Sequence, residues 1–225
     1  MKQQIMTMLD LQNDMNTKVH ADWRTQDFEW YRAIWIECAE LLDHYGWKWW
    51  KKQTPDVDQI ALELVDIWHF GLSLMLLSND SKDVLVDQVE QIFMSPVTSD
   101  DFAIDLESFT EKTLITKDFD LQGFARLMAG INMDFEALYV GYVGKNVLNF
   151  FRQDHGYQEG TYVKEWQGRE DNEHLSELLE DDELEASGWS EPGPDWDETL
   201  PEACWSLVLQ DLHGAVSEAI VKLGI

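Results

Sequence analysis

The chain has 225 residues, of which 44% are hydrophobic and 12% aromatic, including 11 Trp. This composition predicts one substantial hydrophobic core and excludes a chain that is disordered throughout. The 16 basic and 44 acidic residues give a formal net charge of −28, which would repel a polyanion, so we expect no nucleic-acid partner.

The cysteines and the N-terminal residues indicate the cellular compartment of the protein. Cys38 and Cys204 do not make a disulfide framework, which fits a reducing compartment. The first residues, "MKQQIMTMLDLQND", lack the continuous apolar segment of a signal peptide, and we expect no membrane span and no membrane partner. We therefore expect a cytoplasmic protein.

Apolar residues recur at helical spacing along most of the chain, and no alternating strand pattern competes with them. The first predicted helix ends before a loop at 22–26, and Gly46 ends the second. Thr54 and Pro55 supply an N-cap and a first-turn proline for the third. The predicted helices cover about 5–19, 28–45, 55–77, 83–94, 100–115, 121–154 with an interruption near 130–132, and 201–223.

The pattern predicts an all-α fold with one helical catalytic domain over 1–178. Residues 156–167 suggest an ordered loop within it, because they combine Gly, Tyr and Thr. The acidic residues of 179–200 indicate a solvated linker or insertion. We expect 201–225 to form a C-terminal helix that packs on the core or on a dimer partner.

Two pairs of carboxylates repeat the same helical spacing. Glu37 and Glu40 lie three residues apart in one predicted helix, and Glu63 and Asp66 lie three apart in the next. Four carboxylates from two antiparallel helices would repel one another unless cations neutralise them. Mg²⁺ prefers oxygen ligands and keeps waters or phosphates in its shell, so the pattern suggests a Mg²⁺–phosphate site. Acidic pairs on solvated helix faces are, however, common.

Two observations favour the metal site over a solvated face. The segment around Glu63, "IALELVDIWHFGLSLMLL", is so apolar that most of its helix must be buried, and buried carboxylates need partners. Farther along the chain, Lys145, Asn149 and Arg152 form a stripe of hydrogen-bond donors suited to phosphate oxygens. The structural alternative for this stripe is a set of ordinary ion pairs on a solvated face.

The motifs "WIECAEL", "GWKWW", "ELVDIWHFGLSLML" and "YVGKNVLNFFRQDHGYQEGTYVKEWQGREDN" follow one another in the chain. In this order they resemble the dimeric all-α deoxyuridine triphosphatases (dUTPases) of some bacteria, their phages and trypanosomatids. The resemblance covers roughly residues 8–77 and 130–178. It implies an all-α nucleoside triphosphate pyrophosphatase fold, a homodimer, and cytoplasmic action in a bacterial cell or a phage-infected host.

The resemblance also implies an activity, hydrolysis of dUTP and of dUDP to dUMP. The reaction would remove dUTP from the nucleotide pool and supply dUMP for thymidylate synthesis. Two or three Mg²⁺ ions, for which Mn²⁺ could substitute, would be held by Glu37, Glu40, Glu63 and Asp66. Glu37 is the first candidate for the catalytic base, and Glu40 is the alternative.

Further residues are matched to the family's binding positions. The phosphates would be bound by Lys145, Asn149, Arg152, Tyr157 and Lys164. The uracil edge would be read by Gln12 and Asn16, since an amide both donates and accepts hydrogen bonds. Trp47, His69 and Phe70 match an aromatic neighbourhood around the nucleoside, although without the resemblance they would be taken as core residues.

Two other interpretations stay open. A related all-α pyrophosphohydrolase that acts on dCTP, or broadly on several nucleotides, would keep the carboxylates and differ at Gln12, Asn16 and the aromatic residues. A non-catalytic acidic interaction protein on the same fold would have no need of both the carboxylates and the cationic stripe. The segment 180–198 and the final helix have no clear counterpart in the family.

Overall fold

The computed structural model describes residues 1–180, except 79, 96 and 167. The predicted helix at 201–223 and nearly all of the predicted acidic linker lie outside the described residues. The chain divides into two compact units, Met1–Val143 (unit 1) and Gly144–Ile225 (unit 2). The described part is almost entirely helical, which confirms the all-α prediction.

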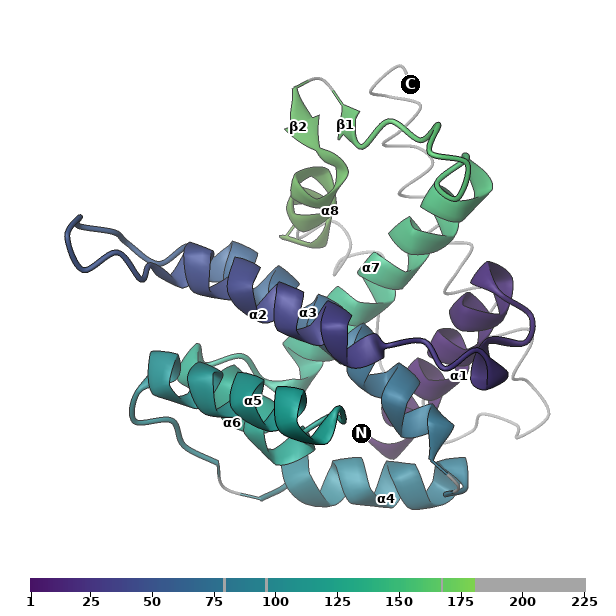
Figure 1. Ribbon diagram of the computed structural model, residues 1–225, viewed down its shortest axis with the longest axis horizontal. Helices are drawn as coiled ribbons and strands as arrows, with labels where there is room; N and C mark the ends of the chain where they lie inside the picture. Colours follow the sequence, from purple (N-terminus) through teal and green to yellow (C-terminus); the bar gives the residue numbers. More distant parts are fainter. Residues whose placement is uncertain (79, 96, 167, 181–225) are drawn as a thin grey trace. The chain divides into compact units, whose positions relative to one another are not determined.

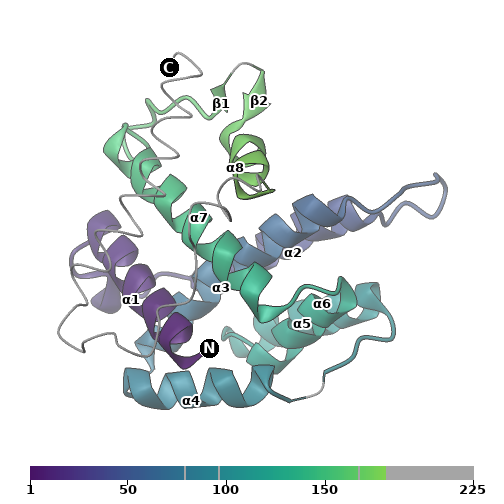
Figure 2. The same cartoon turned by 180° about the vertical axis from the view of Figure 1, so that it is seen from behind.

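Unit 1 is a bundle of helices in which α3 occupies the middle (Figures 1 and 2). α3 packs along most of its length against α2, and it also contacts α1 and α6. The other packed pairs are α2 with α5, α1 with α4, α5 with α6 and α4 with α6. The elements are α1 (Lys2–Val19), a 3-10 turn η1 (Trp23–Thr25), α2 (Trp30–Tyr45), α3 (Val57–Leu77), α4 (Lys82–Phe93), α5 (Phe102–Thr116), α6 (Leu121–Gly130) and the first part of α7 (Phe135–Asp154).

The ends of α2 and α3 follow from local chemistry. Gly46 ends α2, as predicted, with a φ of +95° that favours glycine over other residues. The N-cap of α3 is Asp56, whose carboxylate accepts a hydrogen bond from the backbone N–H of Gln59. The prediction that Thr54 caps α3 is therefore wrong, because the helix begins two residues later than the Thr-Pro signal suggested.

An aromatic cluster around α3 fixes the position of the helix in the core. The Trp68 side chain is fully buried and stacks on Phe124, with ring centroids 5.2 Å apart. Phe93 and Phe119 contact the same indole edge-on. Gly71, one turn after Trp68, lets the Phe119 ring approach the helix backbone so closely that a Cβ there would lie 2.7 Å from it. The burial of α3 is what holds its polar residues in place.

α3 is also the one helix of the described residues that is long and apolar enough to cross a membrane. Within the structure, 67% of its most apolar window is buried. A buried core helix passes the same test of length and composition, and the packing of α3 against α1, α2 and α6 supplies that explanation.

The described residues of unit 2 contain the rest of α7 and three short elements that the sequence did not predict. Strands β1 (Glu165–Trp166) and β2 (Arg169–Glu170) form a small antiparallel hairpin, in which Glu165 pairs with Glu170. Helix α8 (Asp171–Glu180) follows directly. The hairpin is too short to give an alternating pattern, and α8 continues into the acidic residues that were taken as a linker.

Candidate active site

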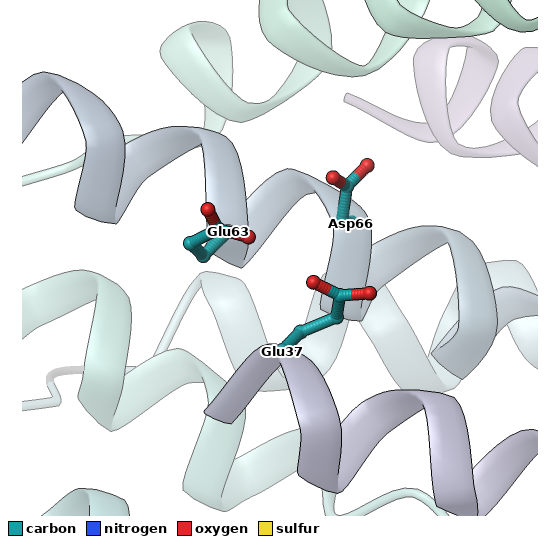
Figure 3. Close-up of side chains that lie close together, drawn as sticks. All are labelled: Glu37, Glu63 and Asp66. Carbon is teal, nitrogen blue, oxygen red and sulfur yellow. The ribbon is translucent and has the colours of Figure 1, made fainter. Parts of the chain in front are cut away.

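Three carboxylates from two helices meet in unit 1. Glu37 comes from α2, and Glu63 and Asp66 come from α3 (Figure 3). One oxygen of each lies within 4.8 Å of the others, so that a single ion could contact all three. Glu63 is 9% exposed, and the other two are half-buried. Such a set of hard oxygen ligands suits a divalent cation.

The electrostatics of this cluster favour a cation or a proton. Burial, followed by repulsion from the carboxylates of Asp66 and Glu63, raises the pKa of Glu37 to about 8. Without a cation, the cluster therefore retains a proton near neutral pH. A bound divalent ion would displace that proton, because metal ligation requires the ionised carboxylate. The three residues thus fit a divalent cation by geometry and by charge.

Glu40, the fourth carboxylate of the predicted set, is exposed and does not belong to this group of three. Its charge still contributes to raising the pKa of Glu37. His44, which was not predicted, places its Nε2 atom 3.5 Å from an oxygen of Glu63. A signal for His44 existed in the sequence, since it lies seven residues after Glu37 and therefore on the same face of α2.

A buried hydrogen-bond network joins α1, α3 and α7 within unit 1. It contains Gln12, Asn16 and His69, three residues predicted to bind the base, and it adds Ser73 and Tyr142. The Gln12 amide nitrogen donates to Asn16 Oδ1 (2.9 Å) and Ser73 Oγ (3.1 Å). Its Oε1 atom accepts from the Tyr142 hydroxyl (3.0 Å) and lies 2.8 Å from His69 Nδ1.

The side chains of this network are almost inaccessible to solvent. Gln12, Asn16 and His69 are at most 4% exposed, and Ser73 and Tyr142 are fully buried. The Tyr142 ring stacks on the His69 ring, with centroids 4.2 Å apart. Sequence reasoning missed Ser73, although it lies one turn after His69. It missed Tyr142 because nothing in the sequence shows that α7 passes beside α1.

The other two predicted base-site residues lie elsewhere. Phe70 packs against Trp30, with ring centroids 6.3 Å apart. Trp47 is 48% exposed, donates a hydrogen bond from its indole N–H to Asp43, and contacts Trp50 edge-on. It belongs to the connection between α2 and α3, which extends away from α1 in both views (Figures 1 and 2). The contacts of Trp47 are thus with the end of α2 and with its own connection, and Gln12 and Asn16 belong to α1.

In unit 2, the predicted phosphate-binding stripe is held by residues of α8. The Arg152 guanidinium donates to both oxygens of Asp171, from Nε at 2.8 Å and from Nη2 at 2.7 Å. It also donates to Asn149 Oδ1 and Asn172 Oδ1. Lys145, which is 2% exposed, donates to the same Asn172 oxygen at 3.0 Å. The structure thus brings Lys145, Asn149 and Arg152 together.

Asp171 and Asn172 were not predicted, although both belong to the "GREDN" motif of the resemblance. Asp171 is fully buried, and burial opposes its ionisation. Hydrogen bonds from Arg152 and the Tyr162 hydroxyl outweigh burial and lower the pKa of Asp171. The carboxylate is therefore charged and orients the guanidinium, as a buried ion pair with a bidentate geometry does.

The remaining two predicted residues follow α7 in the chain. Tyr157 is 48% exposed, and the Arg152 guanidinium carbon lies 5.9 Å from its ring centroid. Lys164 pairs with Glu170 at 3.0 Å. Burial opposes the charging of Lys164, but the Glu170 carboxylate outweighs it and raises the pKa of the lysine. Both side chains therefore lie on the same short unit as Arg152.

Cys38, the one buried thiol of the described residues, is not suited to act as a nucleophile. Burial raises the pKa of Cys38 to about 12, so it stays protonated and is a poor nucleophile at neutral pH. The carboxylate cluster is better suited to activating a water molecule, because a cation held there would acidify a bound water.

Comparison with known proteins agrees with this assignment. A family model described as dUTPase matches residues 4–157, well over half of the chain. No curated protein matches the chain. The matched region contains the three clustered carboxylates, the buried amide network and the predicted phosphate-binding residues of α7. The chain therefore belongs to the dUTPase family, whose members are hydrolases that act on dUTP.

Proposed function

We propose that this protein hydrolyses dUTP to dUMP and pyrophosphate in a Mg²⁺-dependent reaction, and that it also accepts dUDP. The observation that carries the proposal is the cluster of Glu37, Glu63 and Asp66, whose oxygens lie within 4.8 Å of one another in a chain of the dUTPase family. Hydrolysis would remove dUTP from the nucleotide pool and supply dUMP for thymidylate synthesis.

Glu37, Glu40, Glu63 and Asp66 would hold two or three Mg²⁺ ions, for which Mn²⁺ could substitute. When bound, the ions supply a water of lowered pKa and neutralise phosphate charge. Glu37 takes the proton of the attacking water, because it lies within the cluster of carboxylates at which a bound ion would hold that water. Exposed Glu40, whose charge contributes to the raised pKa of Glu37, completes this ligand set and is the alternative base.

The binding residues divide between phosphate and base. Lys145, Asn149 and Arg152 donate hydrogen bonds to phosphate oxygens, and Tyr157 and Lys164 add contacts from the segment after α7. Asp171 and Asn172 keep the cationic side chains oriented, which lowers the entropic cost of binding. The uracil edge is read by Asn16 within the network that Gln12 and His69 share, and Phe70, which follows His69 in α3, adds to the nucleoside site.

The protein works as a cytoplasmic homodimer, with Trp47 serving the nucleoside site of the other subunit. Two observations support this proposal. Trp47 lies on the connection between α2 and α3, which extends away from α1 (Figure 1), and three neighbouring indoles, those of Trp47, Trp49 and Trp50, are exposed there. Exposed aromatic residues of this kind are typical of interface cores.

The test is pyrophosphate release from dUTP, dCTP, dTTP, dATP, dGTP and UTP, each with Mg²⁺ and with chelator. We expect Mg²⁺-dependent turnover with a strong preference for dUTP. Comparable turnover of dCTP or of several nucleotides would keep the metal site and overturn the base specificity. No turnover of any nucleotide would favour a non-catalytic interaction protein.

A further inference from the structure

In the buried network of unit 1, the Ser73 hydroxyl determines which atoms donate and which accept, because its own hydrogen bond is already committed. The Ser73 hydroxyl has a single hydrogen, and it donates to the backbone carbonyl of His69, one helical turn back, at 3.0 Å. Ser73 Oγ must therefore accept from its other two neighbours. These are the amide nitrogens of Gln12, at 3.1 Å, and of Asn16, at 3.0 Å.

This requirement propagates through both amides. With its Nδ2 facing Ser73, Asn16 turns its Oδ1 to the Gln12 nitrogen, which donates to it at 2.9 Å. Gln12 Oε1 then faces the Tyr142 hydroxyl and His69 Nδ1, so the nitrogen of His69 that carries the hydrogen is Nδ1. Every polar contact among the five residues is satisfied in this one arrangement.

The reversed arrangement of the two amides leaves more hydrogen bonds unsatisfied. If both amides turned by 180°, two carbonyl oxygens would face Ser73 Oγ, which could donate to only one of them and would have to release the His69 carbonyl. At the other end, the Tyr142 hydroxyl could accept from Gln12 while donating to the Met8 carbonyl, which lies 3.0 Å away. In the first arrangement the one hydrogen of Tyr142 goes to Gln12 Oε1 and cannot also reach the Met8 carbonyl, so Tyr142 does not favour that arrangement, and the preference for it comes from Ser73.

We propose that Ser73 is a positioning residue that selects uracil over cytosine by fixing the orientation of the Asn16 amide. The inference rests on the proposed hydrolysis of dUTP, with Asn16 reading the base. Asn16 keeps one N–H and one oxygen lone pair beyond its bonds to Ser73 and Gln12. They point to different sides of the amide, because Gln12 and Ser73 occupy the face on which its N–H and its oxygen lie side by side. The remaining N–H can donate to the O4 acceptor of uracil, whereas cytosine has an amino donor at that position, which matches the oxygen of the reversed amide.

The first test needs no substrate. In protein labelled with ¹⁵N-histidine, NMR at pH 8 reports which ring nitrogen of neutral His69 carries the hydrogen. We expect the Nδ1–H form in the wild type, a mixture with the Nε2–H form in Ser73→Ala, and the Nδ1–H form again in Tyr142→Phe. Tyr142→Phe is the matched control, because it also removes a fully buried hydroxyl from Gln12 and keeps the ring on His69.

The second test is the ratio of kcat/KM for dUTP to that for dCTP. In Ser73→Ala we expect this ratio to fall roughly tenfold or more, about the worth of one hydrogen bond, through KM for dUTP with little change in kcat. Tyr142→Phe should keep the ratio. A positioning role predicts this split between KM and kcat, whereas general destabilisation would change both variants alike.

Either of two results would overturn the inference: an Nε2–H form of His69 in the wild type, or Ser73→Ala with the wild-type tautomer and the wild-type ratio. An equal fall of the ratio in Tyr142→Phe would also overturn it. A wild-type protein without turnover of dUTP would instead remove the proposed function, and the tautomer comparison would still decide whether Ser73 orients the network.

Discussion

Glu37, Glu63 and Asp66 acquire their properties from the closeness of two helices. In isolation each would ionise at acidic pH, but burial and mutual repulsion keep a proton on Glu37 until about pH 8. The same raised pKa links this side chain to stability. Between its ordinary pKa of 4.5 and about 8, the folded protein holds a proton that the unfolded chain has released, so stability falls as pH rises through this window.

Glu37→Gln removes this dependence, because glutamine does not titrate. In chelator, we expect the variant to gain in melting temperature relative to the wild type as pH rises from 5 to 8. Saturating Mg²⁺ should raise the wild-type melting temperature at pH 8, since the ion binds only the folded state. A difference between variant and wild type that stays constant over this pH range would contradict the converged cluster.

Asp171 is the second side chain whose environment makes a sharp prediction. It is fully buried and accepts two hydrogen bonds from Arg152, so Asp171→Asn leaves a buried guanidinium without its counter-charge. We expect a loss of about 3–5 kcal/mol in the free energy of unfolding. Glu170→Gln is the control, because its pair with Lys164 is about half exposed, and it should cost about 0–1 kcal/mol. Equal costs in urea titrations would contradict this assignment.

The residues that the sequence identified and those that it missed differ in a physical way. The two carboxylate pairs and the stripe of Lys145, Asn149 and Arg152 are visible because helical spacing puts their members on one face. Tyr142 and Asp171 depend on contacts between elements far apart in the chain, and no local pattern records them. Ser73 and His44 lie at helical spacing from recognised residues, so periodicity could have found them.

At the scale of elements, α3 carries the site because the core holds it on nearly every side. Its existence and its end were predictable from its apolar sequence, as was the end of α2 at Gly46. Its first residue was not, because Thr54-Pro55 and Asp56 both offer a cap and only the tertiary packing chooses between them. The hairpin and α8 escaped prediction because they are short and their sequence is polar.

Gly71 tests how tightly α3 is held. A Cβ at this position would lie 2.7 Å from the Phe119 ring, which Trp68, Phe109 and Phe124 surround. We expect Gly71→Ala to lose about 1–3 kcal/mol of stability through overpacking, even though alanine favours a helix. The cost should shrink in a Phe119→Leu background, where the ring is absent. Denaturant titrations of the double-mutant cycle measure both, and an equal cost in both backgrounds would refute the close contact.

At the scale of the whole molecule, the net charge of −28 and the carboxylate cluster both affect the binding of an anionic substrate. A strongly acidic chain repels a nucleoside triphosphate, so we propose that substrate binding depends on bound cations. General screening by salt would ease the repulsion throughout the molecule. A specific site, in contrast, requires particular carboxylates, and this difference allows the central claim to be tested.

The most direct measurement is Mg²⁺-dependent pyrophosphate release from dUTP by the wild type, Asp66→Asn and Asp58→Asn. Both variants remove one negative charge from α3, but Asp58 is exposed in its first turn and lies outside the carboxylate cluster. We predict that Asp66→Asn lowers kcat on the order of a hundredfold or more, with the helical circular dichroism unchanged, and that Asp58→Asn stays near the wild type. Near-normal turnover in folded Asp66→Asn would contradict the assignment of this cluster as the catalytic metal centre.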